Sequence, residues 1–174
     1  MKKIAKPTQF EHADYYASFI QLVNESTSVL EQLKNNAKQI ELLLLSLTEA
    51  QLTTPYAEGK WCIKDIVQHL IDFERVSVYR AMRFARHDKS AQPFFDENEY
   101  AKFAKASSMP IKKLLKEYKT TRQATLVFFN NQSSDTCKRA GIAGNTMTTV
   151  RALAWIICGH ELHHWGVVRE RYLS

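Results

Sequence analysis

The sequence contains few of the residues that build disulfide-rich, glycine-rich or membrane-spanning proteins. Its 174 residues include three cysteines, five glycines and four prolines. Cys62, Cys137 and Cys158 are too few and too scattered for a disulfide framework, and none falls in a CxxC pair. No apolar run approaches the roughly 20 residues that span a bilayer, and no apolar signal segment follows Met1. We therefore expect a cytoplasmic protein without a membrane partner.

The net charge of +6 does not by itself indicate nucleic-acid binding. Lysine and arginine are interleaved with aspartate and glutamate along most of the chain. Only one group of four lysines resembles a basic stripe: Lys112, Lys113, Lys116 and Lys119. Without a DNA- or RNA-binding motif, a solvated helix face explains this stripe better, and we expect no nucleic-acid partner.

The apolar residues that are present predict an all-α protein. They recur with a period near 3.6 residues, and glycine and proline are scarce. We expect a four-helix bundle with no sheet, forming one domain over residues 1–174. The four helices are predicted at about 26–46, 63–86, 110–130 and 148–172, and residues 131–145 are predicted to form a loop.

The second and third predicted helices are joined by about twenty residues, from His87 to Ser108. A short loop would make these helices antiparallel neighbours. A connection this long allows the chain to cross the bundle, so that the third helix begins parallel to the second. Because the connection carries aromatic residues, we expect it to pack on the bundle.

Histidines stand at core positions of two predicted helices. His160 and His164 are four residues apart, so they project from one helix face about one turn apart. His69 lies within the apolar stripe of the second helix. One reading is that each imidazole is hydrogen-bonded in the core, and for His69 alone we would favour it. Burying three unpartnered imidazoles is costly, however, and one metal ion would satisfy all three. The remaining histidines, His12, His87 and His163, show no such pattern.

The residues His160 to His164 also match the HExxH signature of zinc proteases, with Glu161 as the general base. Two observations weaken this interpretation. Only ten residues follow His164, and they contain no histidine and leave no room for the longer spacing of a third ligand. Glu161 lies about 100° from His160 on the helix, away from the metal face. We therefore do not expect a protease.

Two ordered motifs resemble the DinB-like (DinB/YfiT-type) family of metalloenzymes. The first is Gly59-Lys60-Trp61-Cys62-Ile63-Lys64-Asp65, continuing to His69 and Asp72, and the second is Arg151 to His164. The resemblance covers about residues 15–172. It implies a four-helix bundle with a long crossover between helices two and three, and a metal triad at His69, His160 and His164. Cys62 departs from the usual Ser or Thr, which weakens a helix cap and not the triad.

The resemblance extends to function, because characterised relatives include bacillithiol S-transferases and mycothiol-dependent isomerases. Three histidines leave a coordination position open, which is typical of a catalytic site. The resemblance thus implies a metal-dependent thiol S-transferase that acts on a small electrophile. The alternatives are a metal-dependent hydrolase and a non-catalytic stress-response or binding module whose ion is closed by His163 or Asp72. Zinc or nickel is the expected ion, with iron or manganese as alternatives.

Three further expectations concern residues around the triad. Asp72 is expected to orient a ligand imidazole. Arg80 lies on the His69 face about three turns along, where it could hold an anionic substrate or pair with a core carboxylate. Phe94 and Phe95 are expected to form a symmetric patch in a homodimer.

Overall fold

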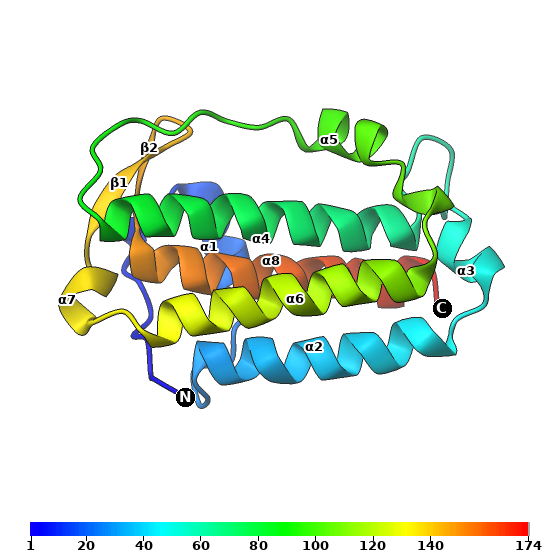
Figure 1. Cartoon of the computed structure of the whole chain (residues 1–174), viewed down its shortest axis with the longest axis horizontal. Helices are drawn as coiled ribbons and strands as arrows, with labels where there is room; N and C mark the ends of the chain where they lie inside the picture. The colour runs from blue at the N-terminus through cyan, green and yellow to red at the C-terminus, as the bar shows by residue number, and fades with distance from the viewer. Residues whose placement is uncertain (174) are drawn as a thin grey trace.

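Four long helices form the body of the molecule in the computed structural model, which describes residues 1–173 (Figure 1). They are α2 (Val29–Ser46), α4 (Ile63–Ala85), α6 (Ile111–Asn130) and α8 (Val150–Arg171). Each lies within three residues of its predicted bounds. The expected all-α four-helix bundle is confirmed.

The four helices form two parallel pairs. α4 and α6 run in the same direction side by side, and α2 and α8 run in the opposite direction (Figure 1). Between the pairs, α4 packs against α8 and α6 packs against α2. The predicted parallel start of the third helix is therefore confirmed, and α4 and α8, which carry the three core histidines, are antiparallel neighbours.

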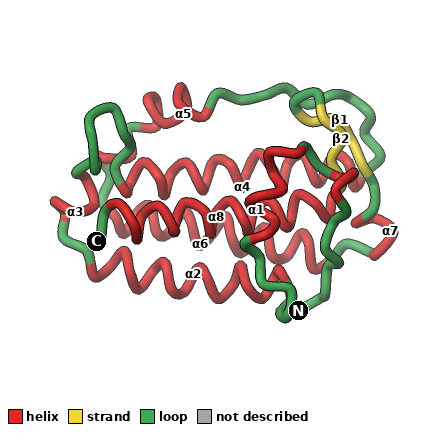
Figure 2. The backbone as a smooth tube through the Cα atoms, turned by 180° about the vertical axis from the view of Figure 1, so that it is seen from behind, coloured by secondary structure: helices red, strands yellow, loops and turns green. Residues whose placement is uncertain are grey.

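The long crossover follows α4 from its C-terminal end back to its N-terminal end (Figures 1 and 2). It contains α5 (Glu97–Ala104) and a 3₁₀ turn, Ala106–Ser108. The side chain of Asp96 caps α5 by accepting hydrogen bonds from the backbone N–H groups of Asn98 and Glu99. This cap fixes the first turn of α5, and with it Glu97, above the α4 surface.

Shorter helices close the ends and one side of the bundle. They are α1 (Ala17–Gln21), α3 (Glu49–Thr53) and α7 (Ser134–Cys137), with 3₁₀ turns at Gln9–Glu11 and Asp14–Tyr16. α1 lies against α8 (Figure 2). Their contact depends on Gly159, where an added Cβ would lie 2.0 Å from the carbonyl oxygen of Phe19. The absence of a side chain there lets the two helices touch.

The prediction of no sheet was wrong in one place. β1 (Ala140–Ala143) and β2 (Thr146–Thr149) form an antiparallel hairpin within the expected loop, with Ala143 opposite Thr146. Its two-residue turn, Gly144-Asn145, has positive φ at both positions, which is the geometry that matches the twist of a hairpin. The crossover joins this hairpin through a parallel bridge between Gln92 and Ala143.

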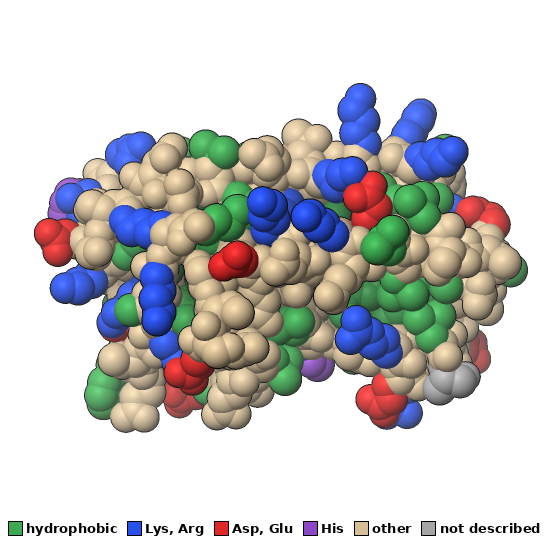
Figure 3. Space-filling view, turned by 90° about the horizontal axis from the view of Figure 1, so that it is seen from below, with side chains coloured by type: hydrophobic (Ala, Val, Ile, Leu, Met, Phe, Trp, Pro, Cys, Tyr) green, Lys and Arg blue, Asp and Glu red, His purple; other side chains and the backbone are tan. Residues whose placement is uncertain are grey.

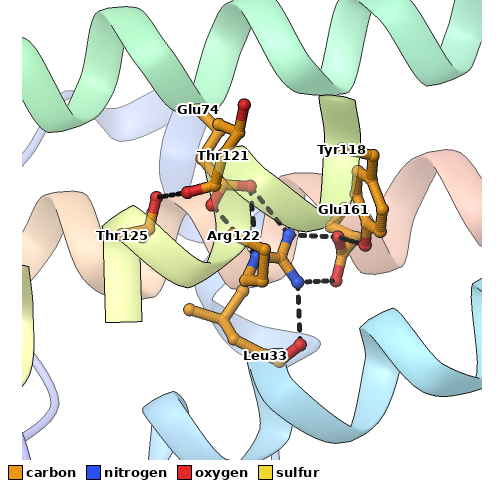
Figure 4. A network of polar contacts seen from close by, with 7 residues as sticks. All are labelled: Leu33, Glu74, Tyr118, Thr121, Arg122, Thr125 and Glu161. Atoms are coloured by element: carbon orange, nitrogen blue, oxygen red, sulfur yellow. Dashed lines mark hydrogen bonds and ion pairs between the residues drawn. The ribbon is translucent and has the colours of Figure 1, made fainter. Parts of the chain in front are cut away.

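One buried guanidinium links all four long helices (Figure 4). Arg122 of α6 donates to the carboxylates of Glu74 on α4 and Glu161 on α8, and to the carbonyl oxygen of Leu33 on α2. The hydroxyl of Tyr118 donates to Glu161. Both ion pairs have side chains at most 3% exposed. The network therefore fixes how α4 and α8 face each other.

The surface carries mixed charge. On the face shown in Figure 3, Lys and Arg side chains are spread out, with Asp and Glu side chains between them. In residues 1–173, no helix combines the length and the apolar content that a membrane crossing requires.

Candidate metal centre

The structure brings His69, His160 and His164 together in the space between α4 and α8. The Nε2 atom of His160 lies 3.0 Å from that of His69 and 3.1 Å from that of His164. His69 and His160 are each 4% exposed, and His164 is half-buried. Three imidazole nitrogens from two antiparallel helices thus converge on one point.

Aromatic side chains hold the imidazoles in place. Phe73, one turn after His69 on α4, stacks on the His160 ring with 3.8 Å between centroids. The indole of Trp61 lies 4.8 Å from the His69 ring, and Phe19 of α1 meets His160 edge-on. Because these rings pack against the imidazoles of His69 and His160, those two side chains have little freedom to turn away from the centre of the triad.

The donor set fits a metal ion better than it fits hydrogen bonding. A ring nitrogen carries either one lone pair or one N–H, so Nε2 of His160 can bond only one of its two imidazole neighbours. Nδ1 of His160 is also buried, and no residue from 1 to 173 forms a hydrogen bond with it. Nitrogens that each lie about 2.0–2.1 Å from a tetrahedral zinc ion would be about 3.3 Å apart, close to the spacing seen here. A single ion would use all three Nε2 lone pairs.

Burial keeps the triad neutral, which is the form that binds metals. Desolvation lowers the pKa of His69 to about 4. Desolvation, together with the charges of His69 and His163, lowers the pKa of His164 to about 3. The pKa of His160 is lowered well below its usual value, mainly by burial and then by the other histidines. At neutral pH all three imidazoles are ready to act as ligands.

A cavity of about 390 Å³ opens onto the triad, which is the size of a small-molecule site. We call it the aromatic cavity, because six of its lining side chains are Tyr15, Tyr16, Phe19, Phe73, Phe94 and Phe95. His160 and His164 line it as well, together with Arg80 and Glu97. Phe94 and Phe95, predicted to form a dimer patch, thus both line this cavity; Phe95 is half-buried and Phe94 is 64% exposed.

Glu97 is the residue of this site that the sequence did not reveal. Its Oε2 atom lies 3.9 Å from Nε2 of His69, and its side chain is 52% exposed at the cavity. Desolvation, followed by the nearby charge of Asp96, raises the pKa of Glu97. The residue comes from the crossover, so helix periodicity in the bundle gave no signal for it.

A second cavity, of about 270 Å³, lies on another side of His164. Its lining includes Tyr56, Lys60, Trp61 and Asn98, and it shares His163 and His164 with the aromatic cavity. The triad therefore borders two separate spaces, each large enough for a small molecule.

Several neighbouring residues differ from their predicted roles. Asp72 accepts a hydrogen bond from Gln68 at 3.0 Å, and within residues 1–173 it does not bond a triad imidazole, so its predicted orienting role is not seen. His163 is exposed and packs on Phe19. Neither residue closes the triad as a fourth ligand in this arrangement. Glu161 points away from the triad into the Arg122 network, as the helix projection predicted.

Arg80 faces the aromatic cavity without a carboxylate partner among residues 1–173. It donates one hydrogen bond, from Nη2 to the carbonyl oxygen of Pro93 at 2.6 Å, and its guanidinium lies 5.9 Å from the Phe95 ring centroid. Only 6% of the residue is exposed, and burial lowers its pKa. Of the two predicted roles, pairing with a core carboxylate is therefore not seen.

Comparison with known proteins places this geometry in a family. A family model described as the DinB superfamily matches residues 19–168. A protein of Geobacillus kaustophilus named "Putative metal-dependent hydrolase" is 31% identical over 126 residues, which are 70% of each chain. One of the same name from Geobacillus thermodenitrificans is 39% identical over 83 residues, so the match spans about half (47%) of each chain.

Solved structures show the same fold. YfiT from Bacillus subtilis, described as a probable metal-dependent hydrolase with an unusual four-helix bundle topology, aligns with a TM-score of 0.73 at 20% identity over 95% of this chain and 90% of its own. A mycothiol-dependent maleylpyruvate isomerase aligns with a TM-score of 0.65 at 12% identity, over 85% of this chain and 61% of its own. The bundle with its crossover, the converging histidines and the matched family model together show that this chain belongs to the DinB superfamily.

Proposed function

We propose that the protein is a metal-dependent hydrolase of small molecules, in which His69, His160 and His164 hold one divalent ion, zinc or nickel. The observation that carries this proposal is the carboxylate of Glu97, which shares a cavity with the triad. A divalent ion bound there would polarise the substrate and favour deprotonation of the attacking nucleophile. The exposed position of His163 and the Gln68 bond of Asp72 support an open, catalytic site over a closed, structural one.

Glu97 would act as the general base. The 3.9 Å between its Oε2 and Nε2 of His69 is too long for a direct hydrogen bond, so a reacting group can approach both. The raised pKa brings Glu97 closer to neutral pH, where a base accepts and returns a proton most effectively. It would take a proton from the attacking water and deliver it to the leaving group. From the sequence alone no general base was visible, which favoured thiol transfer over hydrolysis. The position of Glu97 supplies a candidate base and so favours hydrolysis.

The test is Glu97→Gln in the metal-loaded protein, assayed with small aromatic esters and amides. We expect kcat to fall about 10²–10⁴-fold, as for other general bases, with metal content unchanged. Glu99→Gln is the matched control, because Glu99 lies on the same short helix outside the cavity and forms an ion pair with Lys102. A Glu97→Gln variant with native turnover, or one that loses its ion, would contradict the role of base.

Thiol S-transfer to a small electrophile is the second candidate, and the second cavity favours it. Two spaces that meet at His164 suit two substrates, with the thiol in one and the electrophile in the other. Low-molecular-weight thiols should then shift the spectrum of the cobalt-substituted protein, and His164→Ala should abolish that shift. If no thiol changes the cobalt spectrum and the protein turns over an ester or amide, the results would support hydrolysis and contradict thiol transfer.

A further inference from the structure

We infer that Arg80 is the anion-binding residue of the aromatic cavity and that the cavity takes an organic acid with one carboxylate and an apolar body. This inference rests on the proposed function and names the class of substrate that the site would accept.

The first argument is the unmet bonding capacity of Arg80. A guanidinium has five N–H donors, and here only Nη2 has an acceptor within residues 1–173, a neutral carbonyl oxygen. Elsewhere in this protein a buried arginine is neutralised, since Arg122 bonds two carboxylates. A buried cation without a counter-ion is costly. The free edge of Arg80 borders the cavity, where a ligand carboxylate can accept two parallel N–H bonds.

The second argument is the shape of the space between Arg80 and the triad. Phe73 stacks on His160, Phe95 lies 6.4 Å from Phe73, and the Arg80 guanidinium lies 5.9 Å from Phe95. Two aromatic rings therefore lie between the reacting centre and the cation. A fitting ligand has an apolar, flat segment between its reacting group and its acid.

The third argument is charge. Arg80 is the only Lys or Arg side chain that lines the aromatic cavity in the described part of the chain, and Glu97 lines it too. The single positive charge of the Arg80 guanidinium balances one carboxylate of a ligand. A phosphate monoester would bring a second negative charge to Arg80, and no other Lys or Arg side chain among residues 1–173 lines the cavity to offset it. The cavity thus favours a monocarboxylate.

A purely structural role is the competing explanation, since the bond to Pro93 fastens the crossover to α4. Arg83 provides the matched control. It lies on the same helix and fastens the same crossover through Asp88 and Gln92, but it does not line the aromatic cavity. A variant that merely loosens the crossover should therefore behave like Arg83→Gln.

The experiment measures binding of phenylacetate and of its neutral analogue phenylacetamide to the full chain as purified, by ligand-observed NMR. We expect the native chain to prefer the acid, and Arg80→Gln to weaken acid binding at least about tenfold while the amide is unaffected. Arg80→Lys, which keeps the charge but not the two-bond geometry, should bind the acid with intermediate affinity. Arg83→Gln should bind both ligands as the native chain does.

Three outcomes would overturn the inference: equal binding of acid and amide by the native chain, loss of both ligands in Arg80→Gln, or acid binding that survives in Arg80→Gln and disappears in His164→Ala. The last result would assign the carboxylate to the ion at the triad. Acid binding that depends on Arg80 in a protein without turnover would count against the proposed function alone.

Discussion

Replacing Arg122 with methionine should destabilise the protein more than almost any other single substitution on its polar residues. Methionine fills part of the same space but leaves Glu74 and Glu161 facing each other without a cation. Removing one partner of a buried ion pair costs about 3–5 kcal/mol, and here two carboxylates lose theirs. We expect the free energy of unfolding to fall by about 4 kcal/mol or more. This is a large part of the total for a typical domain, about 5–15 kcal/mol.

The assay is urea denaturation of chelator-treated protein followed by circular dichroism, so that metal binding does not contribute. Arg75→Met is the matched control, because Arg75 also joins α4 to α6, through Glu117 at 2.6 Å, but its side chain is 52% exposed. Such surface pairs contribute about 0–1 kcal/mol. Adding Glu74→Gln and Glu161→Gln to Arg122→Met should recover part of the loss. An Arg122→Met variant within about 1 kcal/mol of Arg75→Met would refute the reasoning.

Three further predictions follow from burial and packing. Gly159→Ala should lower the free energy of unfolding by about 1–3 kcal/mol, because the new methyl group meets the Phe19 carbonyl. Gly166→Ala, on the same helix but with open space around it, should be neutral or stabilising in the same urea assay. Equal effects of the two substitutions would contradict the close contact at Gly159. Burial raises the pKa of Cys62 to about 11 and also raises the pKa values of Cys137 and Cys158. A thiol reagent at about pH 8 should therefore react with none of the three cysteines in the folded protein and with all of them after unfolding. Rapid reaction of a thiol in the folded protein would contradict this prediction. The pKa of His69 is lowered to about 4, and the pKa values of the other two triad imidazoles are lowered too, so zinc affinity should change less than about threefold between about pH 7 and pH 5.5. If the three imidazoles had pKa values near 6.5, protonation would lower zinc affinity a few hundredfold over the same range. A loss of that size in competition titrations would show that the imidazoles are not held neutral.

The long helices could be predicted because their apolar periodicity is strong and their ends carry local signals. α4 was expected at about 63–86 and spans Ile63–Ala85. α8 was expected to begin near Thr148 or Thr149, and Thr149 caps it by accepting a bond from the Ala152 N–H. The converging histidines follow from the same periodicity, since residues on facing stripes of antiparallel helices must meet.

Other features depend on information that helix periodicity does not contain. The hairpin did have a signal, the Gly144-Asn145 pair between short β-prone runs, but its strands are only four residues each. Glu97 reaches the triad because of the path of the crossover, which is set by the Gln92 bridge and by packing on α4. The Arg122 network needs side chains from three helices and a backbone carbonyl oxygen from a fourth. The homodimer stays a prediction, and sedimentation at tens of micromolar protein tests it.

The most direct test of the account is the metal content of the purified protein and of four single alanine variants, measured by inductively coupled plasma mass spectrometry. We predict about one divalent ion per chain in the native protein and in His163→Ala, and at least about tenfold less in His69→Ala, His160→Ala and His164→Ala. Retention of the ion by His164→Ala together with its loss from His163→Ala would contradict the triad.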